Sequence, residues 1–390
     1  MRNVNSSTYS RSETSSKIFS QNQPYIMSGQ SVITYFHTLA ALATFLLWGI
    51  CLLNGTVKAL LIAVWNGRFD NEVALKTNYT GIPLIDYPIA LLVAFFFYGT
   101  NGQDHDYNLF LVDAYSTLQS AFVWLYIEAS RPGSKPKWVE KPMVFGILWQ
   151  CFGAAISLPL YYALHVSWAN QSKTFRAVNA DMAKAIPFGF LLGAVAPAII
   201  GMAPTWNGPE SRTAEMHQNI LFAWQPDPIW VSLIQTGIIT ALPLFHRTAS
   251  RENGISTAQK WIGISYILAA LSSALGHLYT MGSVLCGPSP IATLRRMYVP
   301  FPFSGPAGVT NIFTLGPWLF LQYDLIIIGL SSLSWAYIML ARVSNGKGLS
   351  HGALALTMLV GSLTIGPGAT VSLALLARER LLPVYAKGQK

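Results

Sequence analysis

Long apolar runs separated by short polar connections make up most of the chain from residue 32 onward. A membrane-spanning helix needs roughly 20 mainly apolar residues, and on that basis the pattern predicts an all-α, polytopic transmembrane helix bundle of about 8–9 spanning helices. Residues 56–65 are a continuation of the first helix, a re-entrant piece or an interfacial segment. The windows that approach spanning length are about residues 32–53, 82–99, 108–130, 142–165, 184–202, 228–245, 260–281, 311–341 and 351–377.

The chain reads as one domain with two tails. Residues 31–380 form the predicted multi-pass helical domain, and residues 381–390 a short basic tail. Residues 1–30 are rich in Ser, Asn and Gln and lack the basic, apolar and small-residue order of a cleavable signal, so we expect a disordered polar tail. The Pro- and Gly-rich connection at about 282–310 is either a lid over a cavity or a structured link.

Composition agrees with a chain surrounded mainly by lipid. Hydrophobic residues make up 52% of it and charged residues 11%, while the formal net charge is +9. Lys and Arg in the loops of a membrane protein usually set its orientation and contact anionic headgroups. We therefore expect membrane lipid as a partner and no nucleic acid. Basic residues in the loop 131–141 lean weakly toward a cytosolic position for that loop.

Ionisable side chains inside the predicted helices are few. Each costs about 2.5–3.5 kcal/mol to insert at the centre of a membrane helix, so each needs a partner, a cavity or a function. The loop Asp104-His105-Asp106 has the character of a solvated connection. The candidates within the helices are Asp86, Asp113, Glu128, His277 and Asp324.

The third window places its polar residues on one helical face, which must look inward. The steps from Asp113 through Thr117, Ser120 and Trp124 to Glu128 are three or four residues each. Its two carboxyl groups would lie about 22 Å apart along the axis, so they cannot act on one substrate atom.

Counting helix directions from the first window predicts a one-sided cavity. Asp86, Glu128 and His277 fall at one membrane level and Asp324 lies deeper, near the middle of its helix. Asp113 is then left near the opposite side.

Structural roles compete with catalytic ones for most of these residues. Asp86 stands near a helix start, where a carboxylate caps the helix or interacts with its dipole. Glu128 can pair with Arg131 three residues later, and His277 can be a hydrogen-bonded packing residue. Asp324 is the hardest to explain structurally because it lies near the predicted midplane of its helix.

Motif searches exclude several classes of membrane enzyme. The seven histidines form no HxxxH or HxxHH box, which argues against a di-iron desaturase or hydroxylase. There is no DDxxD or DxDD motif for magnesium-dependent diphosphate chemistry, and no GxSxG or Walker A motif. We therefore expect no metal and no cofactor. Acid–base chemistry in an aromatic cavity remains, because a carboxyl group buried among apolar groups favours its protonated form and aromatic faces stabilise cations.

Three segments carry a resemblance to a known family. GIPLIDYPIALLVAFFFYG (81–99), LQSAFVWLYIEASRPG (118–133) and FLQYDLIIIGLSSLSWAY (320–337) are similar to fungal membrane-bound terpene cyclases of meroterpenoid pathways, particularly the ascofuranone, ascochlorin and macrophorin type. The resemblance implies metal-free, protonation-initiated cyclisation of a farnesyl or epoxyfarnesyl chain on an aromatic polyketide. It also implies a prenylated aromatic substrate and a place in the endoplasmic reticulum membrane. Glu128 and Asp324 match the acidic residues of smaller cyclases by setting, and Asp86 lies in a matching motif.

The hypothesis from sequence is therefore a terpene cyclase. Asp324 or Glu128 would start the reaction by protonating an epoxide or alkene, and another carboxylate, His277 or water would end it. A transporter is the main alternative, since scattered intramembrane carboxylates and Pro-interrupted helices also suit one, although no inverted repeat is found. A receptor or scaffold without chemistry is the third possibility.

Overall fold

The computed structural model describes residues 29–171, 177–245, 251–304, 309–344 and 350–382. Almost all of the predicted N-terminal tail and most of the C-terminal tail lie outside these residues. Within them the chain is helical, and its one pairing of extended backbone is an isolated bridge between Arg68 and Ala74. The all-α fold class is confirmed.

The helices follow one another with short connections. Two of them, η1 and η2, are π-helical turns inside longer helices, and η3 is a short 3₁₀ turn. In chain order they are α2 (Gly29–Thr44), η1 (Phe45–Gly49), α3 (Ile50–Leu53), α4 (Thr56–Asn66), α5 (Pro83–Thr100), α6 (His105–Ala129), α7 (Lys137–Glu140), α8 (Pro142–Phe152), α9 (Ala154–Gln171), α10 (Ala180–Phe190), η2 (Leu191–Val195), α11 (Ala196–Gly201), α12 (Pro204–Asn207), η3 (Pro209–Ser211), α13 (Ala214–Trp224), α14 (Asp227–Phe245), α15 (Arg251–Leu285), α16 (Pro290–Tyr298), α17 (Ile312–Ser344), α18 (His351–Thr364) and α19 (Pro367–Leu381).

Five helices among the described residues are long and apolar enough to cross a membrane, which marks the chain as membrane-embedded. Three shorter apolar helices, α4, α8 and α18, fall below spanning length. The expected 8–9 spans are therefore not confirmed. The five candidates are Gly29–Leu53, Pro83–Thr100, Ala180–Asn207, Gly254–Leu285 and Ile312–Ser344.

Glycines with positive φ divide two of the predicted windows. Gly153, with φ 101°, separates α8 from α9, and Gly366, with φ 88°, separates α18 from α19. Other residues rarely adopt such angles, so these glycines allow sharp breaks inside apolar sequence. The windows 142–165 and 351–377 are thus helix pairs rather than single helices, and Gly55 likewise separates α4 from α3.

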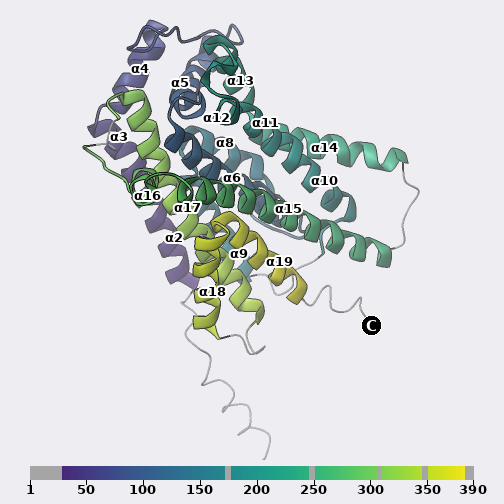
Figure 1. Cartoon of the computed structure of the whole chain (residues 1–390). Coiled ribbons are helices and arrows are strands. Elements are labelled where there is room, and N and C mark those ends of the chain that lie inside the picture. Colours follow the sequence, from purple (N-terminus) through teal and green to yellow (C-terminus); the bar gives the residue numbers. More distant parts are fainter. Residues whose placement is uncertain (1–28, 172–176, 246–250, 305–308, 345–349, 383–390) are drawn as a thin grey trace, which may run out of the picture.

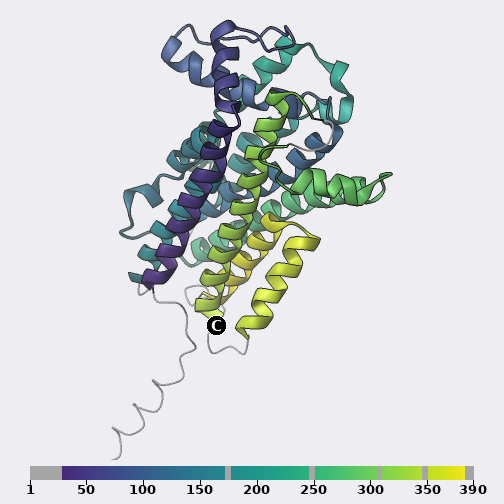
Figure 2. The same ribbon diagram turned by 90° about the vertical axis from the view of Figure 1, so that its left-hand side faces the viewer.

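The helices pack into three groups that α6 joins. Helices α2, α9 and α17 lie against one another, and Figure 2 shows α2 and α17 running side by side along the long direction of the molecule. Helices α10, α14 and α15 extend together to the right in Figure 1, while α4, α5 and α13 gather at its top. Helix α6 joins these parts, because it packs against α15 and α19 and also contacts α5, α8 and α17.

The polar face predicted for residues 108–130 lies inside the protein. Ser120 donates its hydroxyl to the Ala269 carbonyl of α15, at 3.1 Å, and Trp124 donates Nε1–H to Ser372 Oγ of α19, at 2.8 Å. The inward orientation is confirmed, and these bonds join helices where no water is at hand to replace them. The buried residues of this face are Asp113, Thr117, Ser120, Trp124 and Glu128.

Helices α6 and α15 run in opposite directions. Thr280 donates to the Leu109 carbonyl, whereas Ser120 donates to Ala269, so residue numbers rise along one helix as they fall along the other. The direction count from sequence placed Glu128 and His277 at one membrane level, which requires α6 and α15 to run in the same direction. That assignment is wrong. It assumed that each apolar window was one crossing, which fails where Gly153 divides a window into two helices.

Close contact between α4 and α17 gives a test of the packing. A Cβ on Gly316 would lie 2.2 Å from Thr56 Cγ2. We expect Gly316→Ala to lower the free energy of unfolding by about 1–3 kcal/mol, the usual cost of overpacking, in thermal unfolding of the detergent-solubilised protein. Gly237→Ala in α14 is the control, because nothing lies within 4 Å of the added Cβ. Equal midpoints for the two variants would contradict the close packing.

Candidate active site

One pocket opens among the helices that carry the resemblance segments. Its cavity volume is about 260 Å³, close to the lower end of the roughly 300–1,000 Å³ that small-molecule sites have. Its wall comes from η1, α4, α5, α6, α8, α17 and the turn between α8 and α9, and is mostly aliphatic and aromatic. Asp324 is the acidic residue in this wall. Of the residues named from sequence as candidate acids or bases, it is the one that lines the pocket.

Asp324 is positioned by the break between α8 and α9. The residue lies on α17, is 5% exposed, and its Oδ1 accepts the Ala155 N–H at 2.7 Å. That N–H is in the first turn of α9, where backbone donors have no partner within the helix. Gly153 makes the approach possible, since a Cβ there would lie 2.5 Å from Leu47 Cδ2 and 3.1 Å from Asp324 Oδ1. The carboxyl group is therefore held at the pocket wall by backbone N–H groups at the start of α9.

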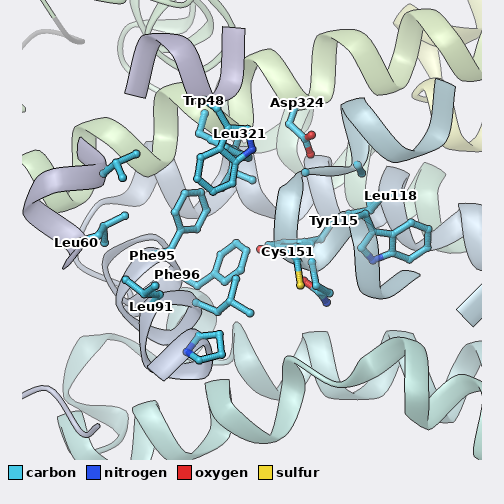
Figure 3. Close-up of a pocket in the computed structure, with 18 of the residues that line it drawn as sticks. Trp48, Leu60, Leu91, Phe95, Phe96, Tyr115, Leu118, Cys151, Leu321 and Asp324 are labelled. Carbon is cyan, nitrogen blue, oxygen red and sulfur yellow. The ribbon is translucent and has the colours of Figure 1, made fainter. Parts of the chain in front are cut away.

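Aromatic rings form a connected series around this carboxyl group. Phe96 contacts Phe95 with ring centroids 4.8 Å apart, Phe95 contacts Phe320 at 5.2 Å, and Phe320 contacts Trp48 at 5.8 Å. Figure 3 shows Asp324 on α17 at one wall, near Trp48, with Phe95 and Phe96 projecting from α5 into the space below it. The pocket thus places one acid beside several π faces, which stabilise nearby positive charge.

Sequence reasoning missed three polar residues at or behind this pocket. Tyr115 and Gln150 line it, and Asp227 is buried behind Gln150 and accepts its Nε2–H at 2.7 Å. The Tyr115 hydroxyl is buried without a hydrogen-bond partner among the described residues. The sequence offered one signal for Asp227. A carboxyl group that follows Pro226 at the start of an apolar window is a candidate buried polar residue.

Glu128 lies in a buried ion network instead of the pocket. It accepts hydrogen bonds from Arg131 Nε at 2.9 Å and from Arg378 Nη1 at 2.6 Å, and Arg131 also pairs with Glu379. Two acidic and two basic side chains balance in charge, and all four are almost inaccessible. The predicted pairing of Glu128 with Arg131 is confirmed. Such a network is costly to break, because any remaining charge would be buried without compensation.

His165 completes the network from α9. Its Nδ1 accepts Nε1–H of Trp335 at 3.1 Å, so the ring proton belongs on Nε2, which lies 3.0 Å from Glu128 Oε2. The imidazole therefore donates to the carboxylate and links α9 and α17 to α6. Glu128 thus accepts hydrogen bonds from Arg131, Arg378 and His165.

His277 and Asp113 lie together, contrary to the predicted separation. His277 Nδ1 is 2.9 Å from Asp113 Oδ1, and Tyr298 of α16 donates its hydroxyl to Asp113 Oδ2 at 2.6 Å. The antiparallel packing of α6 and α15 brings them to one level. The prediction that His277 shares a level with Glu128 is wrong, and its hydrogen bond to Asp113 fits the alternative role as a packing residue.

Asp86 holds the turn before α5. Its carboxylate accepts the backbone N–H and the hydroxyl of Thr80, both at 2.8 Å, and the Gly81 N–H at 3.0 Å. This is the local helix-start role that the sequence allowed. Asp86 faces a separate hollow with Trp65 and Tyr87. The expectation of one cavity shared by Asp86, Glu128, His277 and Asp324 is therefore wrong.

The connection at 282–310 contains a helix that is fixed to α6. Arg296 of α16 pairs with Asp104 at 2.7 Å and with Asp106 at 2.8 Å, and its guanidinium lies 4.8 Å from the Trp318 ring centre. Asp104 and Asp106 thus form ion pairs, and the expectation of a merely solvated connection is wrong. In its described part the segment is a structured link.

Comparison with known proteins places the chain in a family. A family model described as the CtvD domain matches residues 32–383, so the chain belongs to the CtvD-domain family. It is 28% identical to terpene cyclase DEP1 of Fusarium langsethiae over 87% of this chain and 96% of the relative. DEP1 of Alternaria brassicicola is 27% identical, with 90% and 99% covered. Terpene cyclase ascI of Acremonium egyptiacum is 27% identical, with 78% and 79% covered.

These relatives confirm the resemblance to fungal terpene cyclases that the three sequence segments indicate. They support an enzyme that catalyses cyclisation, and they do not favour a transporter. No solved structure matches the chain significantly.

The ion network predicts a structural result for Glu128→Gln. Loss of the central negative charge removes one carboxylate from the pairing of Arg131 and Arg378, whereas Glu379 stays, and breaking a buried pair costs about 3–5 kcal/mol. We expect a lower unfolding midpoint and less folded protein in detergent, measured by thermal unfolding and size exclusion. A normal midpoint together with lost turnover would instead place Glu128 among the catalytic groups.

Proposed function

We propose that the protein cyclises a farnesyl or epoxyfarnesyl chain carried by an aromatic polyketide, without a metal, and that Asp324 supplies the initiating proton. The observation that carries this proposal is the position of Asp324 in the wall of an apolar, aromatic pocket. The terpene cyclase names of the relatives support the reaction class. Contact with membrane lipid belongs to the proposal as well, on the ground of the long apolar helices. Residence in the endoplasmic reticulum membrane is proposed from the resemblance to fungal cyclases together with these helices.

The environment of Asp324 suits a proton donor. Burial among apolar groups disfavours a charged carboxylate, and a protonated acid can donate to an epoxide oxygen or an alkene carbon. Oδ1 is engaged by the Ala155 N–H, so we assign the transferable proton to Oδ2. Glu128, the other candidate from sequence, is occupied by Arg131, Arg378 and His165.

The steps balance without a leaving group. Protonation at the chain terminus opens the epoxide or creates a cation, and the π electrons of the next double bonds form the ring bonds. The final cation loses a proton to the Asp324 carboxylate or to water, or is captured by water, which then loses a proton. In the two water routes the released proton passes to the Asp324 carboxylate, so the enzyme returns to its starting state. The rings of Phe95, Phe320 and Trp48 stabilise the cation while it exists. No group of three or more His, Cys, Asp or Glu that could hold a metal occurs in the described residues.

Asp324→Asn tests the proton donor. The amide keeps an oxygen for the Ala155 N–H but has no acidic proton, so we expect kcat to fall by about 10²–10⁴-fold, the usual contribution of general acid catalysis. Turnover of a prenylated phenol and of its terminal epoxide is measured by product analysis in microsomes. Thermal unfolding should remain close to that of the wild type.

Asp181→Asn is the matched control for this experiment. Asp181 is a partly exposed residue paired with Lys184 on α10, far along the chain from the pocket segments, and we expect its turnover to be normal. Normal turnover by Asp324→Asn with either substrate would falsify the assignment of Asp324.

Phe95→Leu tests the role of the aromatic series. Loss of one π face removes about 0.5–2 kcal/mol of cation stabilisation, so we expect kcat to fall by about 2- to 30-fold, with more of the products that arise from early termination. Product distribution is measured by chromatography. Phe188→Leu, at a 43% exposed position on α10, is the control. An unaltered rate and product pattern in Phe95→Leu would argue against cation stabilisation by this ring.

A further inference from the structure

A buried carboxyl group behind the pocket wall has no part in the chemistry above. Asp227 lies in the first turn of α14 and is 4% exposed. Its Oδ1 accepts Nε2–H of Gln150 from the last turn of α8, at 2.7 Å. Burying a carboxyl group is unfavourable, and among the described residues Gln150 donates a hydrogen bond to it. Asp227 therefore acts on the pocket through the amide of Gln150.

The hydrogen bond fixes the orientation of that amide. Nε2 donates to Asp227, so the NH₂ group faces Asp227 and the carbonyl oxygen Oε1 is directed elsewhere. An amide oxygen accepts hydrogen bonds but cannot donate them. Gln150 lines the pocket, so its amide oxygen is the candidate acceptor in that part of the wall.

The other polar groups of the pocket have different partners or roles, so the Gln150 oxygen is available to accept from a substrate hydroxyl. Asp324 is assigned to the reacting end of the prenyl chain, and Tyr115 contributes a hydroxyl. Trp48 donates its Nε1–H to the Phe152 carbonyl at 2.9 Å. A prenylated phenol has a polar ring and an apolar chain, so the ring needs a polar contact away from the proton donor. Gln150 offers that contact.

We propose that Gln150, oriented by Asp227, accepts a hydrogen bond from a hydroxyl group on the aromatic ring of the substrate. Gln150 is then a specificity-determining residue and Asp227 a positioning residue. The proposal rests on the proposed function, which supplies the aromatic ring. A site that accepts from a hydroxyl discriminates against an analogue without one, because the buried acceptor is then left unpaired. The contact therefore selects a free phenol over its methyl ether.

Equilibrium binding tests this contact independently of turnover. The ligands are a farnesyl phenol with its double bonds reduced, which cannot cyclise, and the methyl ether of the same compound. The purified full-length protein is used in lipid nanodiscs. We expect the wild type to bind the phenol about 3- to 10-fold more tightly than the ether, the range for one net hydrogen bond.

Variants at both residues separate recognition from packing. Gln150→Leu should remove the preference by weakening phenol binding while the ether is unaffected. Asp227→Leu should reduce the preference in the same direction, because the amide is no longer held. Asp227→Asn keeps an acceptor for Nε2–H and should restore the preference. Gln103→Leu, at an exposed position outside the pocket, is the control for the loss of an amide.

The outcomes distinguish this proposal from the proposed function. An unchanged phenol preference in Gln150→Leu, an equal loss for phenol and ether, or no preference in the wild type overturns the role of Gln150. None of these results depends on Asp324. Conversely, normal turnover by Asp324→Asn would overturn the proton donor while the binding preference still stood.

Discussion

A polar side chain inside a membrane has no water to bind, so its partners must come from the protein itself. This constraint accounts for most of the buried polar residues. The hydroxyl groups of α6 bond to carbonyls of α15, Asp113 is held by His277 and Tyr298, and Glu128 is surrounded by Arg131, Arg378 and His165. Each arrangement joins helices distant in sequence. A residue that is fully engaged in this way has little capacity left for exchanging protons with a substrate.

Asp324 is the exception among these buried polar residues, and the helix break at Gly153 is its cause. A continuous helix over residues 142–165 would satisfy its own N–H groups and leave nothing for Asp324 to bind. The positive φ of Gly153 starts a new helix at that level and exposes the Ala155 N–H, which takes one carboxyl oxygen. The acid is thus held firmly enough to be oriented and loosely enough to keep an oxygen for chemistry. Structure and proposed reactivity depend on the same turn.

The sequence predicted the helical class, the family and the inward polar face of α6, because these follow from apolar periodicity and from contiguous motifs. The local roles of Asp86 and of the Glu128–Arg131 pair were among the alternatives that the sequence allowed, because they depend on residues close in the chain. The sequence-based prediction failed where the position of a residue depends on contacts between helices distant in the chain. The level of His277 depends on how many crossings precede α15, and a glycine inside apolar sequence does not reveal whether it breaks a helix. Arg378 lies 250 residues from Glu128, so no local pattern could pair them.

The turn after α8 also connects the two ends of the proposed site. Gln150 lies three residues before Gly153, and Ala155 lies two residues after it. One short segment therefore presents the amide held by Asp227 and the N–H that holds Asp324. The backbone of this segment brings the two polar ends of the proposed site close in sequence, while Asp227 of α14 and Asp324 of α17 complete them. A substrate whose ring binds Gln150 would then have its chain folded back toward Asp324, and this folding is what ring closure requires of a flexible prenyl chain.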